Sequence, residues 1–163
     1  MIVIRAVEDG DLSQLLELNE AAVPHVNSIP LEEMEWFKEH ARFFWVAEVN
    51  DRIAGLLIVL APGIPYRSVN YQWFSNAYTS FAYVDRIIVS ETARGEGVGK
   101  ALYQKLFEES RSFTDIVACE VNIEPPNPRS LKFHSSMGFS EVGKQRTERD
   151  TKTVSLLIKN LTG

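Results

Sequence analysis

Apolar positions along the chain follow two spacings that alternate with each other. Short runs rich in β-branched and aromatic residues predict β-strands, and apolar residues that recur every three or four positions predict helices. The predicted strands cover residues 2–7, 43–49, 52–60, 81–89, 116–121, 139–146 and 153–159. The predicted helices cover residues 12–23, 31–40 and 98–111, with a short fourth helix that ends at Gly138. Helices interleaved with strands indicate an α/β (α+β) fold with a mixed central sheet flanked by helices.

Two connections in this pattern differ strongly. Asn50-Asp51 separates two adjacent strand-like runs, which predicts a β-hairpin with a tight turn. Residues 61–78, in contrast, open with two prolines and a glycine and predict a long irregular loop. Loops of this length inside a compact domain are usually functional or mobile. The chain of 163 residues shows no linker, repeat or low-complexity segment, so we expect one domain over residues 1–163.

Composition excludes several classes of protein. With 45% hydrophobic and 24% charged residues, the chain has the composition of a soluble globular protein. The longest apolar stretch, residues 53–62, is half of the ~20 residues that a membrane helix needs, and the first residues are too acidic for a secretory signal. A net charge of −5 argues against nucleic acid as a partner. The lone Cys119 fits a reducing compartment and reads as a small buried hydrophobe, so we expect a cytoplasmic protein.

The strongest chemical signal is a glycine-rich turn, RGEGVGKALYQKL, between a predicted strand and a helix. Glycine lets the backbone approach a ligand closely, and the unpaired N–H groups of a helix N-terminus favour an anion such as phosphate. The P-loop pattern fails, because Arg94 replaces its first glycine and Ala101 its serine or threonine. The dinucleotide fingerprint also fails, because Lys100 occupies its last glycine position. A tight turn shaped by glycine without a ligand is the structural alternative.

The spacing that fits is Arg-x-x-Gly-x-Gly, at Arg94, Gly97 and Gly99. Here the sequence resembles the GNAT superfamily of N-acetyltransferases. The preceding strand, YVDRIIVSETARGEG, and the downstream segment NPRSLKFHSSMGF resemble two further family motifs in the family's order. The downstream match is carried by Asn127, Ser130, Phe133, His134, Gly138 and Phe139.

The resemblance implies a splayed cleft that binds acetyl-CoA as acyl donor, with no metal. It implies that the loop backbone holds the pyrophosphate, that a backbone N–H of Ile87 or Ile88 stabilises the oxyanion, and that pantetheine pairs near Val89. The implied cofactor-binding loop comprises Arg94, Gly95, Glu96, Gly97, Val98, Gly99 and Lys100. Asn127 joins this set, and it also reads as the N-cap of a helix with Pro128 at its first position.

Acetyl transfer to an amine needs a group that removes the amine's proton and benefits from one that protonates the thiolate. For the base the resemblance favours Asp85, which shares a strand face with Tyr83 and Ile87. The alternative is a structural ion pair with Arg86, Arg94 or a lysine, and Glu120 is a second candidate base. For the acid, His134 occupies the position of the usual tyrosine, and it also reads as an inert helix histidine. Tyr103 is not at the corresponding position, whereas Tyr78 could substitute.

The aromatic residues of residues 61–78 are candidates for the acceptor pocket: Tyr66, Tyr71, Trp73 and Tyr78. Their alternative role is to pack the loop onto the core. The first 80 residues hold 11 acidic and five basic side chains, and the rest hold 11 and 12. This asymmetry favours a cationic small-molecule or peptide amine as acceptor. A non-catalytic acyl-CoA-binding module and a nucleotide-binding protein are the alternative functions. A homodimer through the late strands is compatible with the sequence, but nothing in it establishes one.

Overall fold

The computed structural model describes residues 1–147 and 151–162. The strands in these residues are β1 (Ile2–Ala6), β2 (Phe43–Val49), β3 (Arg52–Leu60), β4 (Ala82–Val89), β5 (Ile116–Glu124), β6 (Ser140–Thr147) and β7 (Lys152–Asn160). The α-helices are α1 (Leu12–Ala21), α2 (Leu31–His40), α3 (Val69–Ala77), α4 (Val98–Ser110) and α5 (Pro128–Ser136), with short 3-10 turns η1 (Asp9–Asp11) and η2 (Glu91–Ala93). They form two compact units: unit 1 contains Met1–Leu60 and Val84–Leu106, and unit 2 contains Ala61–Tyr83 and Phe107–Gly163. The boundaries between the units fall within β4 and within α4, so each of these two elements has residues in both units.

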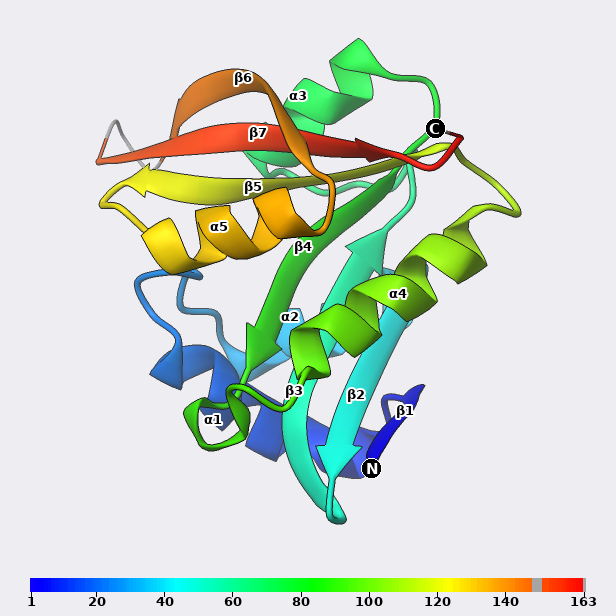
Figure 1. Cartoon of the computed structure of the whole chain (residues 1–163), viewed down its shortest axis with the longest axis vertical. Coiled ribbons are helices and arrows are strands. Elements are labelled where there is room, and N and C mark those ends of the chain that lie inside the picture. The colour runs from blue at the N-terminus through cyan, green and yellow to red at the C-terminus, as the bar shows by residue number, and fades with distance from the viewer. Residues whose placement is uncertain (148–150, 163) are drawn as a thin grey trace. The chain divides into compact units, whose positions relative to one another are not determined.

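Unit 1 is built on an antiparallel meander of β1, β2 and β3, followed by most of β4. Asn50 and Asp51 have φ angles of 51° and 62°, the left-handed conformation that a tight hairpin turn of this type requires. The hairpin predicted from these two residues is therefore confirmed. In Figure 1, α4 lies in front of these strands and α1 and α2 lie behind them. The apolar faces of α1 and α2 bury Leu15, Met34 and Phe37 completely.

Unit 2 is organised around β5. The start of β4 pairs with it in parallel, joining Ala82 to Val117 and Tyr83 to Ala118. On its other edge β5 pairs antiparallel with β7, and β7 pairs antiparallel with β6. Helix α5 packs on β5 and α3 packs on β6 (Figure 1). The combination of parallel and antiparallel pairs with interleaved helices confirms the predicted mixed α/β fold class.

The prediction of an irregular loop over residues 61–78 is wrong, because α3 occupies its second half. Ser68 begins this helix, and its side chain accepts a hydrogen bond from the backbone N–H of Tyr71 at 3.3 Å. Tyr71 and Phe74 then lie three positions apart and are both buried. The prolines and glycine that suggested a loop all precede Ser68, so they mark only the entry to the helix.

Candidate functional site

The glycine-rich turn lies in unit 1, between η2 and α4. Gly95 and Gly97 have φ angles of +86° and +84°, in the left-handed region that favours glycine. A Cβ atom added at either glycine would meet no other atom within 4 Å. The glycines therefore allow the backbone to adopt this conformation and leave open space beside it. This space lies directly before the N-terminus of α4, a helix of 13 residues. These features fit the phosphate-bearing part of acetyl-CoA, because a helix N-terminus offers N–H donors and a positive dipole end to an anion.

A third glycine, Gly55 on β3, fixes the distance between β3 and the end of β4. A Cβ atom there would lie 2.7 Å from the backbone oxygen of Ile88 and 3.2 Å from Cγ1 of Val98. The next backbone bond, from Ser90 N–H to the Ala54 oxygen at 2.8 Å, anchors the strand end. Only glycine allows this close approach, so Gly55 positions the strand that leads into the glycine turn. The sequence prediction missed it because its partner lies on another strand.

On β4 itself, the side chain of Ile88 is buried, whereas Ile87 and Val89 are half-buried. The sequence predicts that these three residues contribute backbone groups, so no chemical role is assigned to their side chains. All of them lie in unit 1, with the glycine turn.

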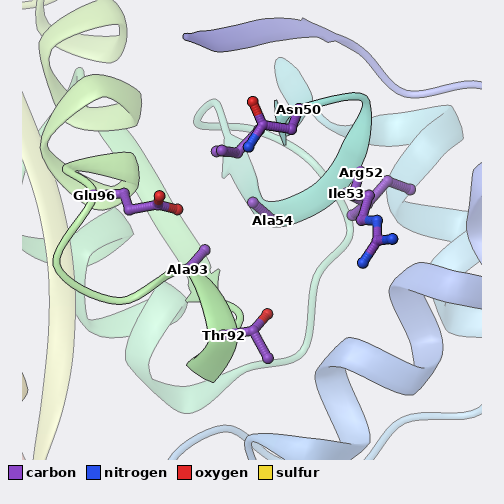
Figure 2. Close-up of a pocket in the computed structure, with 8 residues that line it drawn as sticks. Asn50, Arg52, Ile53, Ala54, Thr92, Ala93 and Glu96 are labelled. Carbon is purple, nitrogen blue, oxygen red and sulfur yellow. The ribbon is translucent and has the colours of Figure 1, made fainter.

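A hollow with a volume of about 470 Å³ lies beside the glycine turn in unit 1. Figure 2 shows Asn50 and Ala54 on its hairpin side and Thr92, Ala93 and Glu96 on its loop side. Of the predicted cofactor-binding residues, only Glu96 is among those that line it. The hollow thus lies mainly between the β2–β3 hairpin and η2, and Glu96 of the glycine turn borders it.

Asp85, the predicted base, forms a buried ion pair with its neighbour on β4. Its Oδ2 accepts a hydrogen bond from Nε of Arg86 at 2.7 Å, and the side chains of Asp85 and Arg86 are only 4% and 2% exposed. The guanidinium also donates to Oδ1 of Asn19 at 2.6 Å and to Oδ1 of Asn27 at 2.9 Å. We call these four residues the Arg86 cluster. The structure thus provides the ion pair with Arg86 that was the structural alternative for Asp85.

The charges of the Arg86 cluster affect the pKa of Glu33 on α2. Partial burial raises the pKa of its carboxyl above the usual range, and the negative charge of Asp85 acts in the same direction. Arg86 opposes both effects. Glu33 is therefore one acidic residue of α2 that is not fully solvated.

Glu120, the second candidate base, lies in unit 2 and is held differently. The Tyr83 hydroxyl donates to both carboxylate oxygens, at 2.7 and 2.8 Å, and Nδ2 of Asn70 donates to Oε1 at 3.1 Å. Oδ1 of Asn70 in turn accepts a hydrogen bond from Nε2 of Gln145 at 2.8 Å. We call these four residues the Glu120 cluster. Sequence reasoning found Glu120 but missed Asn70 and Gln145, which come from α3 and β6.

His134, the predicted acid, is 3% exposed in α5. Burial lowers the pKa of its imidazole, and the hydrogen bond to the Ser130 backbone oxygen only partly opposes that effect. Because Nδ1 lies 2.8 Å from that oxygen, Nδ1 carries the proton of the neutral ring and Nε2 carries the lone pair. In this state the ring accepts a proton at Nε2 more readily than it donates one.

Asn127 begins α5 as predicted. Its Oδ1 accepts a hydrogen bond from Ser130 N–H at 3.4 Å, and Pro128 follows at the first helical position. The capping role read from the sequence is confirmed. Cys119, on the neighbouring strand, is 2% exposed, as expected for a small buried hydrophobe.

The predicted acceptor-binding aromatics form part of the packing of α3. Tyr71 is 3% exposed, its hydroxyl donates to the Ala61 oxygen at 2.6 Å, and its ring contacts Tyr66 and Tyr83 edge-on. Trp73 lies against Gly143 of β6, where an added Cβ would approach its ring to 2.9 Å. Tyr78 stacks on Phe74 at the end of the helix. Tyr66, Trp73 and Tyr78 are half-buried, whereas Tyr71 is buried.

Two classes of feature are absent from residues 1–147 and 151–162. They contain no group of three or more His, Cys, Asp or Glu side chains arranged to hold a metal ion. No helix among them has the length and apolarity to cross a membrane.

Comparison with known proteins identifies the family to which the chain belongs. The model of the acetyltransferase (GNAT) family matches residues 12–139, and the chain belongs to this family. The chain is 28% identical over 152 residues to an L-2,4-diaminobutyric acid acetyltransferase of Nocardia farcinica, an alignment that covers 92% of this chain and 68% of the relative. It is 25% identical over 139 residues to an N-alpha-acetyltransferase of Sulfurisphaera tokodaii, with coverages of 85% and 80%.

Solved structures agree on the fold. An acetyltransferase from Salmonella typhimurium, yncA, whose structure contains its cofactor acetyl-CoA, superposes with a TM-score of 0.72 at 16% identity. The alignment covers 99% of this chain and 94% of that one. The resemblance to GNAT acetyltransferases predicted from the three sequence motifs is therefore confirmed.

Proposed function

We propose that this protein is an acetyl-CoA-dependent N-acetyltransferase that acetylates a primary amine by direct attack in a ternary complex. The glycine turn carries the proposal: in a member of this family, Gly95 and Gly97 hold left-handed conformations with open space beside them, directly before α4. The matched relatives support an amino-group acceptor, since one is named for 2,4-diaminobutyric acid and the other for N-alpha acetylation.

Acetyl-CoA supplies the thioester whose carbonyl carbon the amine attacks, so that a C–N bond forms and the C–S bond breaks. The residues proposed to hold it are the loop from Arg94 to Lys100, the backbone of Val89 and Asn127. The backbone N–H of Ile87 or Ile88 is proposed to stabilise the negative charge on the carbonyl oxygen. Holding both reactants in one orientation supplies much of the rate by itself.

Asp85 is the proposed acceptor of the amine's proton. It lies two residues before Ile87 on β4, so its carboxylate and the proposed oxyanion donor belong to the same stretch of strand. Its hydrogen bond with Arg86 fixes the orientation of the carboxylate. Replacement of Asp85 by asparagine keeps the size and is expected to lower kcat by about 100-fold or more, the usual contribution of a general base.

His134 is the proposed source of a proton for the departing thiolate. Since its neutral ring carries a proton on Nδ1, it has to gain one at Nε2 before it can donate from there. We therefore expect His134→Gln to lower kcat and to change its pH dependence, measured by thiol release. A variant with unchanged kcat across pH would exclude His134 from the reaction.

Calorimetric titration with acetyl-CoA tests the cofactor part of the proposal. Gly97→Glu should weaken binding by about tenfold or more, because it brings a negative charge to the proposed phosphate site. Gly63→Glu is the matched control, since Gly63 has a φ of +88° and equally open space but lies outside the loop. Absence of acetyl-CoA binding by the unmodified protein would contradict the proposal.

A non-catalytic acyl-CoA-binding module is the second candidate. The buried ion pair of Asp85 and the burial of His134 favour it, because both groups already have structural partners. Thiol release across a panel of amines, amino acids and basic peptides separates the two functions. Turnover that Asp85→Asn abolishes would exclude the binding module, and acetyl-CoA binding without turnover would favour it.

A further inference from the structure

The loop that contains the glycine turn is attached to β3 at both of its ends. At its start, the backbone N–H of Ser90 donates to the oxygen of Ala54 at 2.8 Å. At its end, Cγ1 of Val98 lies 3.2 Å from the position that a Cβ atom of Gly55 would occupy. Two adjacent residues of one strand thus contact both ends of the loop from residue 90 to residue 98, and all of them belong to unit 1.

Between these two ends, backbone hydrogen bonds within the loop set its shape. The N–H of Ala93 donates to the Ser90 oxygen at 3.0 Å, and that of Glu96 donates to the Ala93 oxygen at 3.3 Å. The N–H of Ala101 then donates to the Gly97 oxygen at 3.0 Å, at the start of α4. These short-range bonds determine how the loop curves, whereas the two contacts with β3 determine where the loop lies on the sheet.

Gly55 is the point of this attachment at which a side chain would interfere. Its backbone is not left-handed, unlike that of Gly95 and Gly97, so a side chain there would act through contacts alone. A Cβ atom would lie 2.7 Å from the backbone oxygen of Ile88, closer than Cβ atoms approach other atoms in proteins. Its other neighbour, Val98, is 1% exposed and has little room to move. An added methyl group therefore has to push the end of β4 and the first turn of α4 away from β3.

Val98 begins α4, and the first N–H groups of an α-helix have no acceptor within the helix. A shift of this turn changes the direction of several such donors together, because they belong to one helix. We propose that Gly55 is a positioning residue for acetyl-CoA, which holds the first turn of α4 and the end of β4 at a fixed distance from β3. The inference rests on the proposed function, since the bound molecule is taken to be acetyl-CoA. In this role Gly55 acts through Val98 and Ile88 and needs no contact of its own with the cofactor.

Calorimetric titration with acetyl-CoA tests the inference on three glycine-to-alanine variants. Gly55→Ala should weaken binding by about tenfold or more, because hydrogen bonds weaken steeply when their donors are misdirected. Gly143→Ala, on β6 in unit 2, is the first control, since its Cβ would also make a close contact, 2.9 Å from a ring carbon of Trp73. Gly10→Ala is the second, since it adds the same methyl group to unit 1 where no atom lies within 4 Å. Both controls should bind acetyl-CoA as tightly as the unmodified protein.

Amide hydrogen exchange of the protein without cofactor tests the attachment of the loop by itself. Gly55→Ala should raise the exchange rate of residues 90–100 by about tenfold or more over that in Gly143→Ala, as measured by mass spectrometry. A substitution that only lowers global stability raises exchange throughout the chain and leaves the dissociation constant of the folded protein unchanged. The two measurements together therefore separate positioning from a general loss of stability.

The outcomes also separate this inference from the proposed function. Unchanged acetyl-CoA affinity in Gly55→Ala, or an equal loss in either control, would overturn the role of Gly55 and leave the proposed function intact. If the unmodified protein does not bind acetyl-CoA, the proposed function fails and the exchange experiment decides about the loop. Faster exchange confined to residues 90–100 of Gly55→Ala would then show that Gly55 fixes the loop, and unchanged exchange would overturn that as well.

Val98→Ala tests the same contact from the other side. It removes the methyl group that lies against Gly55, so it should also raise exchange in residues 90–100, and it replaces Gly55→Ala if that variant does not fold by circular dichroism. Combined with Gly55→Ala, it should weaken acetyl-CoA binding by less than the product of the two separate effects, because it makes room for the added methyl group. A combined effect equal to that product would overturn the claim that Gly55 acts through Val98.

Discussion

Asp85 in unit 1 and Glu120 in unit 2 are both carboxylates in strands, yet their partners differ in charge. Asp85 accepts from the Arg86 guanidinium at 2.7 Å, and both side chains are almost completely buried. Glu120 accepts from the hydroxyl of Tyr83 and the amide of Asn70. The first carboxylate is thus held by a cationic donor, and the hydrogen bonds described for the second come from neutral donors.

The two clusters differ in what remains when one member is removed. In the Arg86 cluster the amides of Asn19 and Asn27 complete the guanidinium's hydrogen bonds, so removing one member leaves a charge buried without its partner. In the Glu120 cluster the loss of the Tyr83 or Asn70 donor removes a hydrogen bond but no counter-charge. We therefore expect a loss from the first cluster to lower stability more than a loss from the second.

The largest expected effect is that of Arg86→Met. This change keeps the long apolar stem but leaves Asp85 buried without its counter-charge, and it should lower the free energy of unfolding by about 3–5 kcal/mol. Urea denaturation followed by circular dichroism measures it. Arg52→Met, at an exposed arginine of β3, is the control and should change stability by no more than about 0.5 kcal/mol. Equal effects of the two substitutions would remove the basis of the comparison.

Tyr83→Phe should have a smaller effect on stability. It removes the hydrogen bond to Glu120, worth about 1.5–3 kcal/mol for a charged acceptor, and keeps the ring contacts with Tyr71 and Phe74. The same denaturation experiment with Tyr78→Phe, a half-buried tyrosine at the end of α3, provides the reference. If Tyr83→Phe were as destabilising as Arg86→Met, the two clusters would not differ in the way proposed.

His134 extends the comparison to a group that is buried in its neutral form. Because its pKa is lowered in the folded protein, the unfolded chain binds more protons below the ordinary value of 6.5, and stability is lost as pH falls below it. Between pH 7.5 and 5.5 this single group accounts for at most about 1.4 kcal/mol. His134→Gln should remove that part of the pH dependence, measured as the difference between the two proteins' unfolding free energies.

Subtraction isolates His134 from other titrating groups. The raised pKa of Glu33 acts in the opposite direction, since the folded state then binds the extra proton, and this contribution is present in both proteins. The lowered pKa of Asp11 stabilises the folded state above the ordinary value of 3.8, and that stabilisation is lost as pH falls below it. A difference between the two proteins that does not vary with pH would contradict burial of a neutral His134.

Much of the fold followed from local signals. The turn at Asn50-Asp51 and the cap at Asn127 each depend on neighbouring residues, and both were predicted correctly. The strand β5 extends to Glu124, beyond the predicted end at residue 121, because its register with β7 continues past the apolar run. Helix α3 was missed, since Pro62, Gly63 and Pro65 obscured the helical spacing of the aromatic residues after Ser68.

The candidate site was predicted less completely, because its contacts join distant parts of the sequence. The glycine turn was found from spacing alone, since its conformation is set within a few residues. Asn19, however, lies 67 residues from Arg86, and Asn70 lies 75 residues from Gln145. No local pattern marks an asparagine as the support of a distant charged group. The buried ion pair of Asp85 with Arg86 and its asparagine partners therefore depends on tertiary contacts that the sequence does not display.

The smallest expected effect is that of an exposed ion pair between an arginine and a carboxylate. Arg94 and Glu91 approach to 3.9 Å beside the glycine turn, but their side chains are 43% and 83% exposed. Water and salt screen such a pair, so a double-mutant cycle with Arg94→Gln and Glu91→Gln should give a coupling energy below about 0.5 kcal/mol. The cycle is measured by urea denaturation at low and at high salt. A coupling energy as large as the loss of unfolding free energy in Arg86→Met would mean that burial does not make the ion pair of Asp85 and Arg86 strong. The difference between the two clusters would then rest on the number of hydrogen bonds alone.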